Sequence, residues 1–127
     1  MNQSRIAEIK TLKGKSFDLS RLIKLCGELN IAFENNCYFS VAMLVRSILD
    51  HVPPIFGCNS FAEVANNYKG TRSFKSQMEH LEVSSRKIAD SYLHTQIRNK
   101  ESLPNSTQVD FSNDLDVLLG EIHRLLK

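Results

Sequence analysis

The sequence lacks the features that define several familiar classes of protein. No apolar run approaches the roughly 18–20 residues that a membrane-spanning helix needs, and the N-terminus has no secretory apolar core. We therefore expect a cytoplasmic protein with no membrane partner. The chain also has no glycine-rich phosphate loop, no HExxH motif and no Ser/His/Asp motif, which excludes the major enzyme templates.

Cysteine is scarce and badly spaced for a structural role. The three cysteines, Cys26, Cys37 and Cys58, are odd in number and form no CxxC pair. This pattern argues against a disulfide framework and against a structural zinc site, which needs four closely paired ligands. We expect no metal and no cofactor, and we expect the thiols to behave as small buried hydrophobic groups. A nucleophilic cysteine is the alternative, but no histidine lies at a recognised motif spacing from any of them.

The residues that are present favour one helical domain. At 127 residues with 42% apolar content, the chain is long enough for one domain with a real core. Apolar residues recur at helical spacing over most of its length. We expect a tail or short helix over residues 1–15 and a single helical domain over residues 16–127.

The expected fold is all-α, an up-down bundle of four to five helices around an apolar central helix. The segment CYFSVAMLVRSILDHV is apolar nearly all round, as in the central helix of a bundle, and Pro53-Pro54 ends it. A capping box, Ser60–Glu63, opens a short helix. The other expected elements are a helix from Leu19 to Asn35-Asn36, a long helix from near Ser73 to about Arg98, a loop over residues 99–110, and a last helix from near Ser112.

Charge is unevenly distributed along the second half of the chain. Residues 69–100 carry seven basic and three acidic residues, whereas residues 101–127 carry two basic and five acidic ones. A basic segment of this kind is consistent with a phosphate-binding face, and RNA or a nucleotide is a candidate ligand. Ordinary solvated charge with pairing inside the chain is the alternative.

A polar strip is expected along the long helix. Arg86, Asp90, His94 and Arg98 are spaced four residues apart, so successive members climb one side of a helix. Arginine can hold a phosphate with two hydrogen bonds, and histidine can move a proton near neutral pH. Asp90 would orient the imidazole. An exposed helix face with i,i+4 ion pairs is the alternative interpretation.

A second constellation lies on the central helix. Arg46 and Asp50 share a face of an otherwise apolar segment, and His51 follows directly. The group either opens onto a cleft or dimer seam, or it is an ion pair at the bundle surface with His51 near the negative end of the helix dipole. His80 and His123 are isolated in the sequence, and we expect each at the surface or at the boundary of the core.

These residues resemble the motif of the HEPN superfamily. Its members are small helical bundles in which an arginine is followed, after four to six residues, by a histidine. Arg46-SILD-His51 has this spacing, with Ser47 where the family usually has Asn, Asp or His. The segment from Lys87 to His94 also matches in position, with lysine in place of arginine, and Arg86 lies one residue too far away. The resemblance implies a metal-independent ribonuclease site across a homodimer in active members, and nucleotide or protein binding in others.

From these patterns we expect a HEPN-like domain of bacterial phage defence or of a toxin–antitoxin system, acting as a ribonuclease. Arg86 and Arg46 would hold phosphate, His94 would transfer the proton, and Asp90 would orient it. The alternative is a non-catalytic helical module that binds or is attached to an effector protein. Because the central helix is apolar nearly all round, we also expect a two-fold homodimer.

Overall fold

The computed structural model describes residues 3–12 and 16–127. Within these residues the regular secondary structure is helical, with no strand. The all-α class predicted from the sequence is confirmed. The helices are α1 (Gln3–Lys10), α2 (Ser20–Glu34), α3 (Tyr38–His51), the 3₁₀ helix η1 (Pro53–Phe56), α4 (Phe61–Asn67), α5 (Arg72–Tyr92), α6 (Ser106–Val109) and α7 (Ser112–Leu126).

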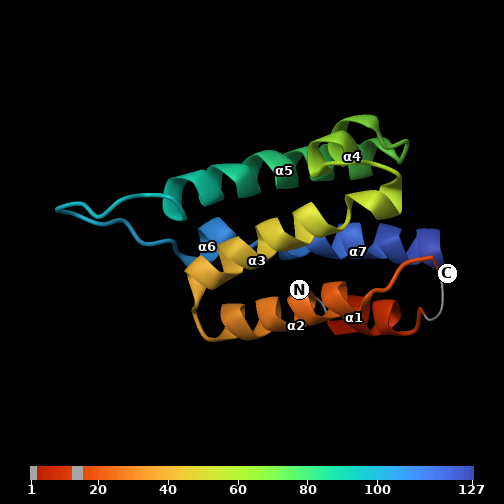
Figure 1. Cartoon of the computed structure of the whole chain (residues 1–127), viewed down its shortest axis with the longest axis horizontal. Coiled ribbons are helices and arrows are strands. Elements are labelled where there is room, and N and C mark those ends of the chain that lie inside the picture. Colours follow the sequence, from red (N-terminus) through yellow and green to blue (C-terminus); the bar gives the residue numbers. More distant parts are fainter. Residues whose placement is uncertain (1–2, 13–15) are drawn as a thin grey trace.

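Five of the helices pack in a closed ring. α2 lies against α3, α3 against α5, α5 against α7, α7 against α1, and α1 against α2. The long helices run in alternating directions along one axis, with α2, α3 and α5 side by side (Figure 1). Ile48, Leu49, Leu118 and Leu119 are among the side chains buried inside the ring. The hydrophobic core therefore lies inside this ring of five helices.

The N-terminal segment belongs to the bundle. Of the two alternatives for residues 1–15, the short helix is found over Gln3–Lys10, and its Ile6 and Ile9 are buried in the core. Residues 1–2 and 13–15 lie outside the described residues. The weak apolar spacing of this segment is sufficient for a helix in the bundle, because α1 buries only the narrow face that contacts α7 and α2.

The central helix forms for the reasons that its sequence suggests. Tyr38–His51 buries Val41, Val45 and Ile48, and the chain turns into η1 where Pro53 and Pro54 lack the N–H groups that would continue an α-helix. By length and composition alone, Tyr38–Phe56 could cross a membrane, so the sequence-based exclusion of such a segment was too broad. Its buried face packs into the bundle, as in the core helix of a water-soluble protein.

Local capping explains where several helices begin. Thr71 accepts a hydrogen bond from the Phe74 N–H at 3.1 Å and opens α5. Ser60 accepts one from the Glu63 N–H, as predicted, but the Glu63 carboxylate accepts from the Asn59 N–H and not from Ser60. The Asp18 carboxylate accepts from the Ser20 N–H, while Leu19 occupies the cap position of α2.

Two predicted boundaries were wrong. The long helix ends at Tyr92, six residues before Arg98, and the Thr95 hydroxyl donates to the Ser91 carbonyl at 2.8 Å. The predicted loop 99–110 contains the short helix α6, because Asn105 and Gln108 form a reciprocal capping box there. Between these points, residues 93–105 project from the end of the bundle (Figure 1).

The three cysteines differ in environment, which corrects the expectation that all are buried. Cys26 is buried in α2, Cys58 is half-buried, and Cys37 is exposed in the turn between α2 and α3. Burial raises the pKa of the Cys26 thiol to about 12. The thiolate that reacts with electrophiles is therefore suppressed at Cys26 by its surroundings.

We predict that a maleimide reagent at pH 8 labels Cys37 rapidly in the folded protein and labels Cys26 only after unfolding, because burial both shields the Cys26 sulfur and disfavours its thiolate. Intact-mass spectrometry over time gives the measurement. In a Cys37→Ser control, the fast phase should disappear. Rapid labelling of Cys26 in folded Cys37→Ser protein would contradict the buried placement of α2.

Candidate functional site

Arg46 occupies the seam between α3 and α5. Its guanidinium donates to Glu82 Oε2 at 3.2 Å and to the Ser85 hydroxyl at 3.0 Å, and its other terminal nitrogen reaches Asp50 Oδ1 at 3.3 Å. The Arg46 side chain is only 16% exposed, whereas that of Asp50 is 71% exposed. The predicted Arg46–Asp50 pair is therefore present, but the main partner of Arg46 is a buried carboxylate on another helix.

That carboxylate, Glu82, is the residue that the sequence analysis missed. Its side chain is 9% exposed and is shared by two arginines, because Arg86 also donates to Glu82 Oε1, from Nε at 3.2 Å and from Nη2. A buried carboxylate without partners would be costly, and two guanidinium groups remove that cost. Glu82 lies on the buried, apolar face of α5, between Leu81 and Ser85. A charged residue on the buried face of a helix is the sequence signal that could have identified it.

We call Arg46, Asp50, Glu82, Ser85 and Arg86 the seam network. Its two arginines are balanced by two carboxylates. The hydrogen bond and the charge of Glu82, in that order, raise the pKa of Arg86, and the nearby charges of Asp90 and Asp50 add to this. With Asp90 included, acidic groups outnumber basic ones. The seam network thus carries no excess positive charge that would attract a polyanion by itself.

The histidine of the predicted strip is not on the helix. Because α5 ends at Tyr92, the expected strip is wrong in its second half: Arg86 and Asp90 lie on α5, whereas His94 and Arg98 lie in the projecting segment beyond it. About 9 Å of helix separates Arg86 from Tyr92 at 1.5 Å per residue. His94 is exposed, and no hydrogen bond or ion pair joins it to the described part of the chain.

His51 also points away from the seam network. It is half-buried in the last turn of α3, five residues after Arg46. Five residues of helix rotate by about 140° beyond a full turn, so the two side chains leave α3 in divergent directions. The arginine and histidine of the predicted HEPN-like motif therefore do not converge within one chain.

The other two histidines are less isolated than their sequence positions suggested. His80 Nδ1 lies 2.8 Å from Asp114 Oδ2 on α7, and His123 Nδ1 lies 3.8 Å from Glu8 Oε2 on α1. Each thus links two helices of the ring. Among residues 3–12 and 16–127, no group of three or more His, Cys, Asp or Glu side chains is arranged to hold a metal ion.

Exposed apolar side chains continue the face beside the seam network. Phe39 and Met43 are on α3, with Met43 55% exposed, and the Phe39 ring packs edge-on against Tyr92 at 6.3 Å. Ile97 and Leu103 lie in the projecting segment, and Ile97 is 94% exposed. A hollow of about 310 Å³ is lined by Phe39, Tyr92, Ile97 and Leu103 together with polar residues of the projecting segment. We call Phe39, Met43, Tyr92, Ile97 and Leu103 the apolar end.

Comparison of the chain with protein-family models, with curated proteins and with solved structures gave no match. The HEPN-like identity therefore stays a prediction from the sequence motif.

The seam network yields a prediction about stability. Arg46→Ala should lower the free energy of unfolding by about 3 kcal/mol, because it removes the buried partner of a buried carboxylate. Arg86→Ala should cost about 1 kcal/mol, because its side chain is 58% exposed and screened by water. Urea denaturation followed by circular dichroism gives both values.

Lys87→Ala is the matched control for these variants. Lys87 is an exposed residue next to Arg86, and its replacement should change stability by no more than about 0.5 kcal/mol. If Arg46→Ala were as stable as Lys87→Ala, Glu82 would not depend on Arg46 and the seam would not be held by this ion pair.

Proposed function

We propose that the chain is a helical interaction module that forms a two-fold homodimer through the apolar end and the adjoining seam network. The observation that carries this proposal is the exposure of Phe39, Ile97 and Leu103 around one hollow, with exposed Met43 one turn further along α3 from Phe39. Contiguous exposed apolar surface is unusual on a monomer and marks interaction sites. Burying one such side chain in an interface contributes about 1.5–3 kcal/mol.

The charges around the apolar end support a second copy as the partner. Basic Arg98 and acidic Glu101 both line the hollow, and both are exposed. Within the chain, Arg98 Nε lies 3.5 Å from Glu101 Oε1. A two-fold interface brings residue i against j and j against i, so a patch that carries both signs can match its own copy.

We predict that the wild-type chain is a dimer at tens of micromolar and that Met43→Lys and Leu103→Lys are monomers, because each places an unpaired charge in the apolar interface. Light scattering coupled to size-exclusion chromatography gives the mass. Both residues are exposed in the monomer, so the circular dichroism spectrum should not change.

Leu125→Lys is the control for these variants. Leu125 is a partly exposed leucine near the C-terminal end of α7. That end of α7 lies away from the projecting segment (Figure 1). The Leu125→Lys variant introduces the same charge and should leave the dimer intact. A wild-type monomer at tens of micromolar, or equal dissociation of the Leu125→Lys variant, would count against the proposal.

RNA cleavage is the second candidate function, and one observation favours it. Arg46 and Arg86, the expected phosphate-binding residues, converge on Glu82, and the Arg86 side chain remains 58% exposed. Arg86 would contact a phosphate, and Arg46 would position it through Glu82. Because His51 and His94 do not reach these arginines within one chain, the proton-transfer histidine would come from the second copy in the dimer.

The HEPN resemblance implies chemistry in which the RNA 2′-hydroxyl attacks the adjacent phosphorus and the 5′-oxygen leaves. A base takes the 2′-proton and an acid supplies a proton to the leaving oxygen, so the products carry a cyclic phosphate and a 5′-hydroxyl. His94 of the second copy is the proposed proton-transfer group. DNA lacks the nucleophile and should be inert.

We predict that His94→Ala lowers the rate of RNA cleavage by roughly 10²–10⁴, the usual range for a positioned acid–base group, and that activity survives EDTA. Arg86→Ala should weaken both binding and turnover. The assay uses end-labelled structured and unstructured RNA, with His80→Ala and His123→Ala as controls that keep activity. Absence of cleavage by the wild type, or equal rates for His94→Ala and His51→Ala, would leave the interaction module alone.

A further inference from the structure

α1 closes the ring of helices by packing between α7 and α2, across the ring from the seam network. Its Ile6 and Ile9 lie one turn apart on the buried face of the helix, at 6% and 1% exposure. We call the surface of α2 and α7 beneath this helix the α1 groove. The α1 groove is already shaped for a short amphipathic helix, and it lies on helices that carry neither the seam network nor the apolar end.

The polar contacts of α1 give the α1 groove a specific pattern. Gly120, in the interior of α7, leaves room for the Arg5 guanidinium, because a Cβ atom at this position would lie only 3.1 Å from Arg5 Cζ. Arg5 Nη1 donates to Glu8 Oε2 at 3.1 Å, and the same carboxylate oxygen lies 3.8 Å from His123 Nδ1 on α7. Glycine inside a helix destabilises the helix relative to alanine, so Gly120 is explained by the guanidinium that it accommodates. The docked pattern, from Arg5 to Ile9, is basic, aliphatic, any residue, acidic, aliphatic.

α1 is the ring helix that the bundle holds least firmly. It has eight residues and two buried side chains, whereas α2, α3, α5 and α7 have 14 to 21 residues and four or more buried side chains each. Helices shorter than about 12–15 residues are marginal in water on their own, so α1 is helical because it is docked. Segments with few buried apolar contacts open at a lower free-energy cost than the whole fold. We therefore expect α1 to leave the α1 groove while the other helices stay packed.

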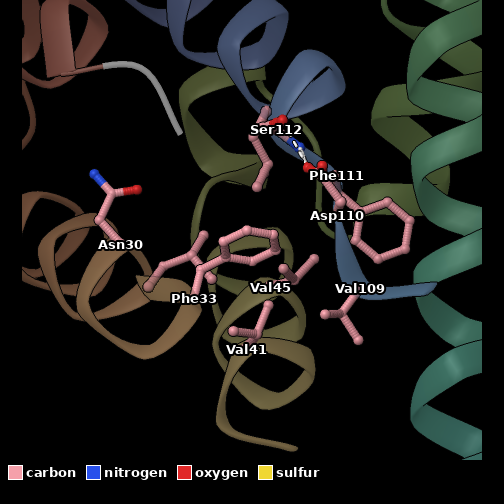
Figure 2. Close-up of a pocket in the computed structure, with 10 residues that line it drawn as sticks. Asn30, Phe33, Val41, Val45, Val109, Asp110, Phe111 and Ser112 are labelled. Atoms are coloured by element: carbon pink, nitrogen blue, oxygen red, sulfur yellow. Dashed lines mark hydrogen bonds between the residues drawn. The ribbon is translucent and has the colours of Figure 1, made fainter. Parts of the chain in front are cut away.

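The α1 groove continues beyond the helix that occupies it. At 1.5 Å per residue, the eight residues of α1 extend roughly 12 Å, whereas the 15 residues of α7 extend roughly 22 Å. The contacts of α1 with Gly120 and His123 fall in the second half of α7. Beside the first turn of α7, the space between α2 and α7 is a hollow of about 90 Å³, lined by Phe33 and Leu115 and by valines of α3 (Figure 2). A longer helix that followed the groove would cover apolar surface that α1 does not reach.

We propose that the α1 groove is the docking site for an amphipathic helix of a partner protein, and that α1 is its intramolecular competitor. The partner helix carries the docked pattern of α1 and extends it by about two turns at its N-terminal end, with aliphatic side chains that continue the Ile6–Ile9 stripe toward the hollow. These additional contacts let it displace a tethered helix, because a short tether gives α1 an effective concentration on the order of millimolar. The assignment goes beyond the homodimer and rests neither on it nor on RNA cleavage.

The test is a titration of the isotope-labelled full chain followed by nuclear magnetic resonance. The probe is an acetylated peptide with the sequence of α1, extended at its N-terminus by about two turns with leucine at the stripe positions. The same peptide without the extension is its matched companion. We expect the extended peptide to move the methyl signals of Ile6 and Ile9 to their positions in the free peptide, to shift the Gly120 amide signal, and to leave the Ile48 methyl signals unchanged. The unextended peptide should not compete with the tethered α1 of the wild type.

Two substitutions separate the competitor from the groove. Ile9→Asp places a charge on the buried face of α1 and should release it, so both peptides should bind this variant, the extended one at least about tenfold more tightly than it binds the wild type. Added to Ile9→Asp, Gly120→Leu fills the space of the basic residue and should weaken binding of the extended peptide about tenfold. Ile31→Asp is the matched control, because Ile31 is 62% exposed on α2 and the same change there should leave binding as in the wild type.

Failure of the extended peptide to release Ile6 and Ile9 at up to millimolar concentration would overturn the proposal. Unfolding of the whole chain by Ile9→Asp would also overturn it, because α1 would then be part of the core and not a docked ligand. Equal competition by the unextended peptide in the wild type would overturn the partner assignment in favour of α1 of a second copy. Binding that Gly120→Leu leaves unchanged would place the peptide outside the α1 groove, with the same consequence for the proposal.

Discussion

Burial of the Glu82 carboxylate is the constraint on which the arrangement of α3 and α5 depends. A carboxylate with 9% exposure is tolerated only where cations and hydrogen-bond donors surround it. Arg46 supplies these from α3, and Arg86 supplies them from one turn further along α5. The two helices are therefore held in one register by a directional contact, in addition to the non-directional packing of their apolar faces.

The same constraint limits what the candidate site can do. Arginines that are committed to a buried carboxylate are less available to a phosphate, and the acidic neighbours Asp50 and Asp90 remove the remaining positive field. A face with balanced charge and exposed Met43 beside it is closer in chemistry to a protein interface than to a polyanion groove. The balanced charge therefore favours an interaction module over RNA cleavage, although the Arg86 guanidinium of the seam network remains exposed.

The all-α class and most helices could be predicted from the sequence, because apolar periodicity and proline report directly on helix faces and ends. The end of α5 could not be predicted, because Thr95, Ile97 and Arg98 are all residues that a helix can contain. The helix ends at Tyr92 because the chain beyond it has nothing to pack against, and the sequence does not show this. The importance of Glu82 was hidden because a charge count does not distinguish a buried carboxylate from a solvated one. The Arg46 and His51 side chains point in different directions because of helix geometry. A motif match that considers only the spacing of two residues does not test whether their side chains converge.

α3 separates two kinds of polar environment within one small bundle. On its α5 side, the polar groups of the seam network satisfy one another, and such networks make a fold rigid and specific. On its other side, Asn30 of α2 lines a small cavity, and its buried side-chain nitrogen has no hydrogen-bond partner within the described part of the chain. A buried donor without a partner costs free energy, and the bonded groups of the seam network avoid that cost. The two flanks of α3 therefore differ in how fully their polar groups are bonded.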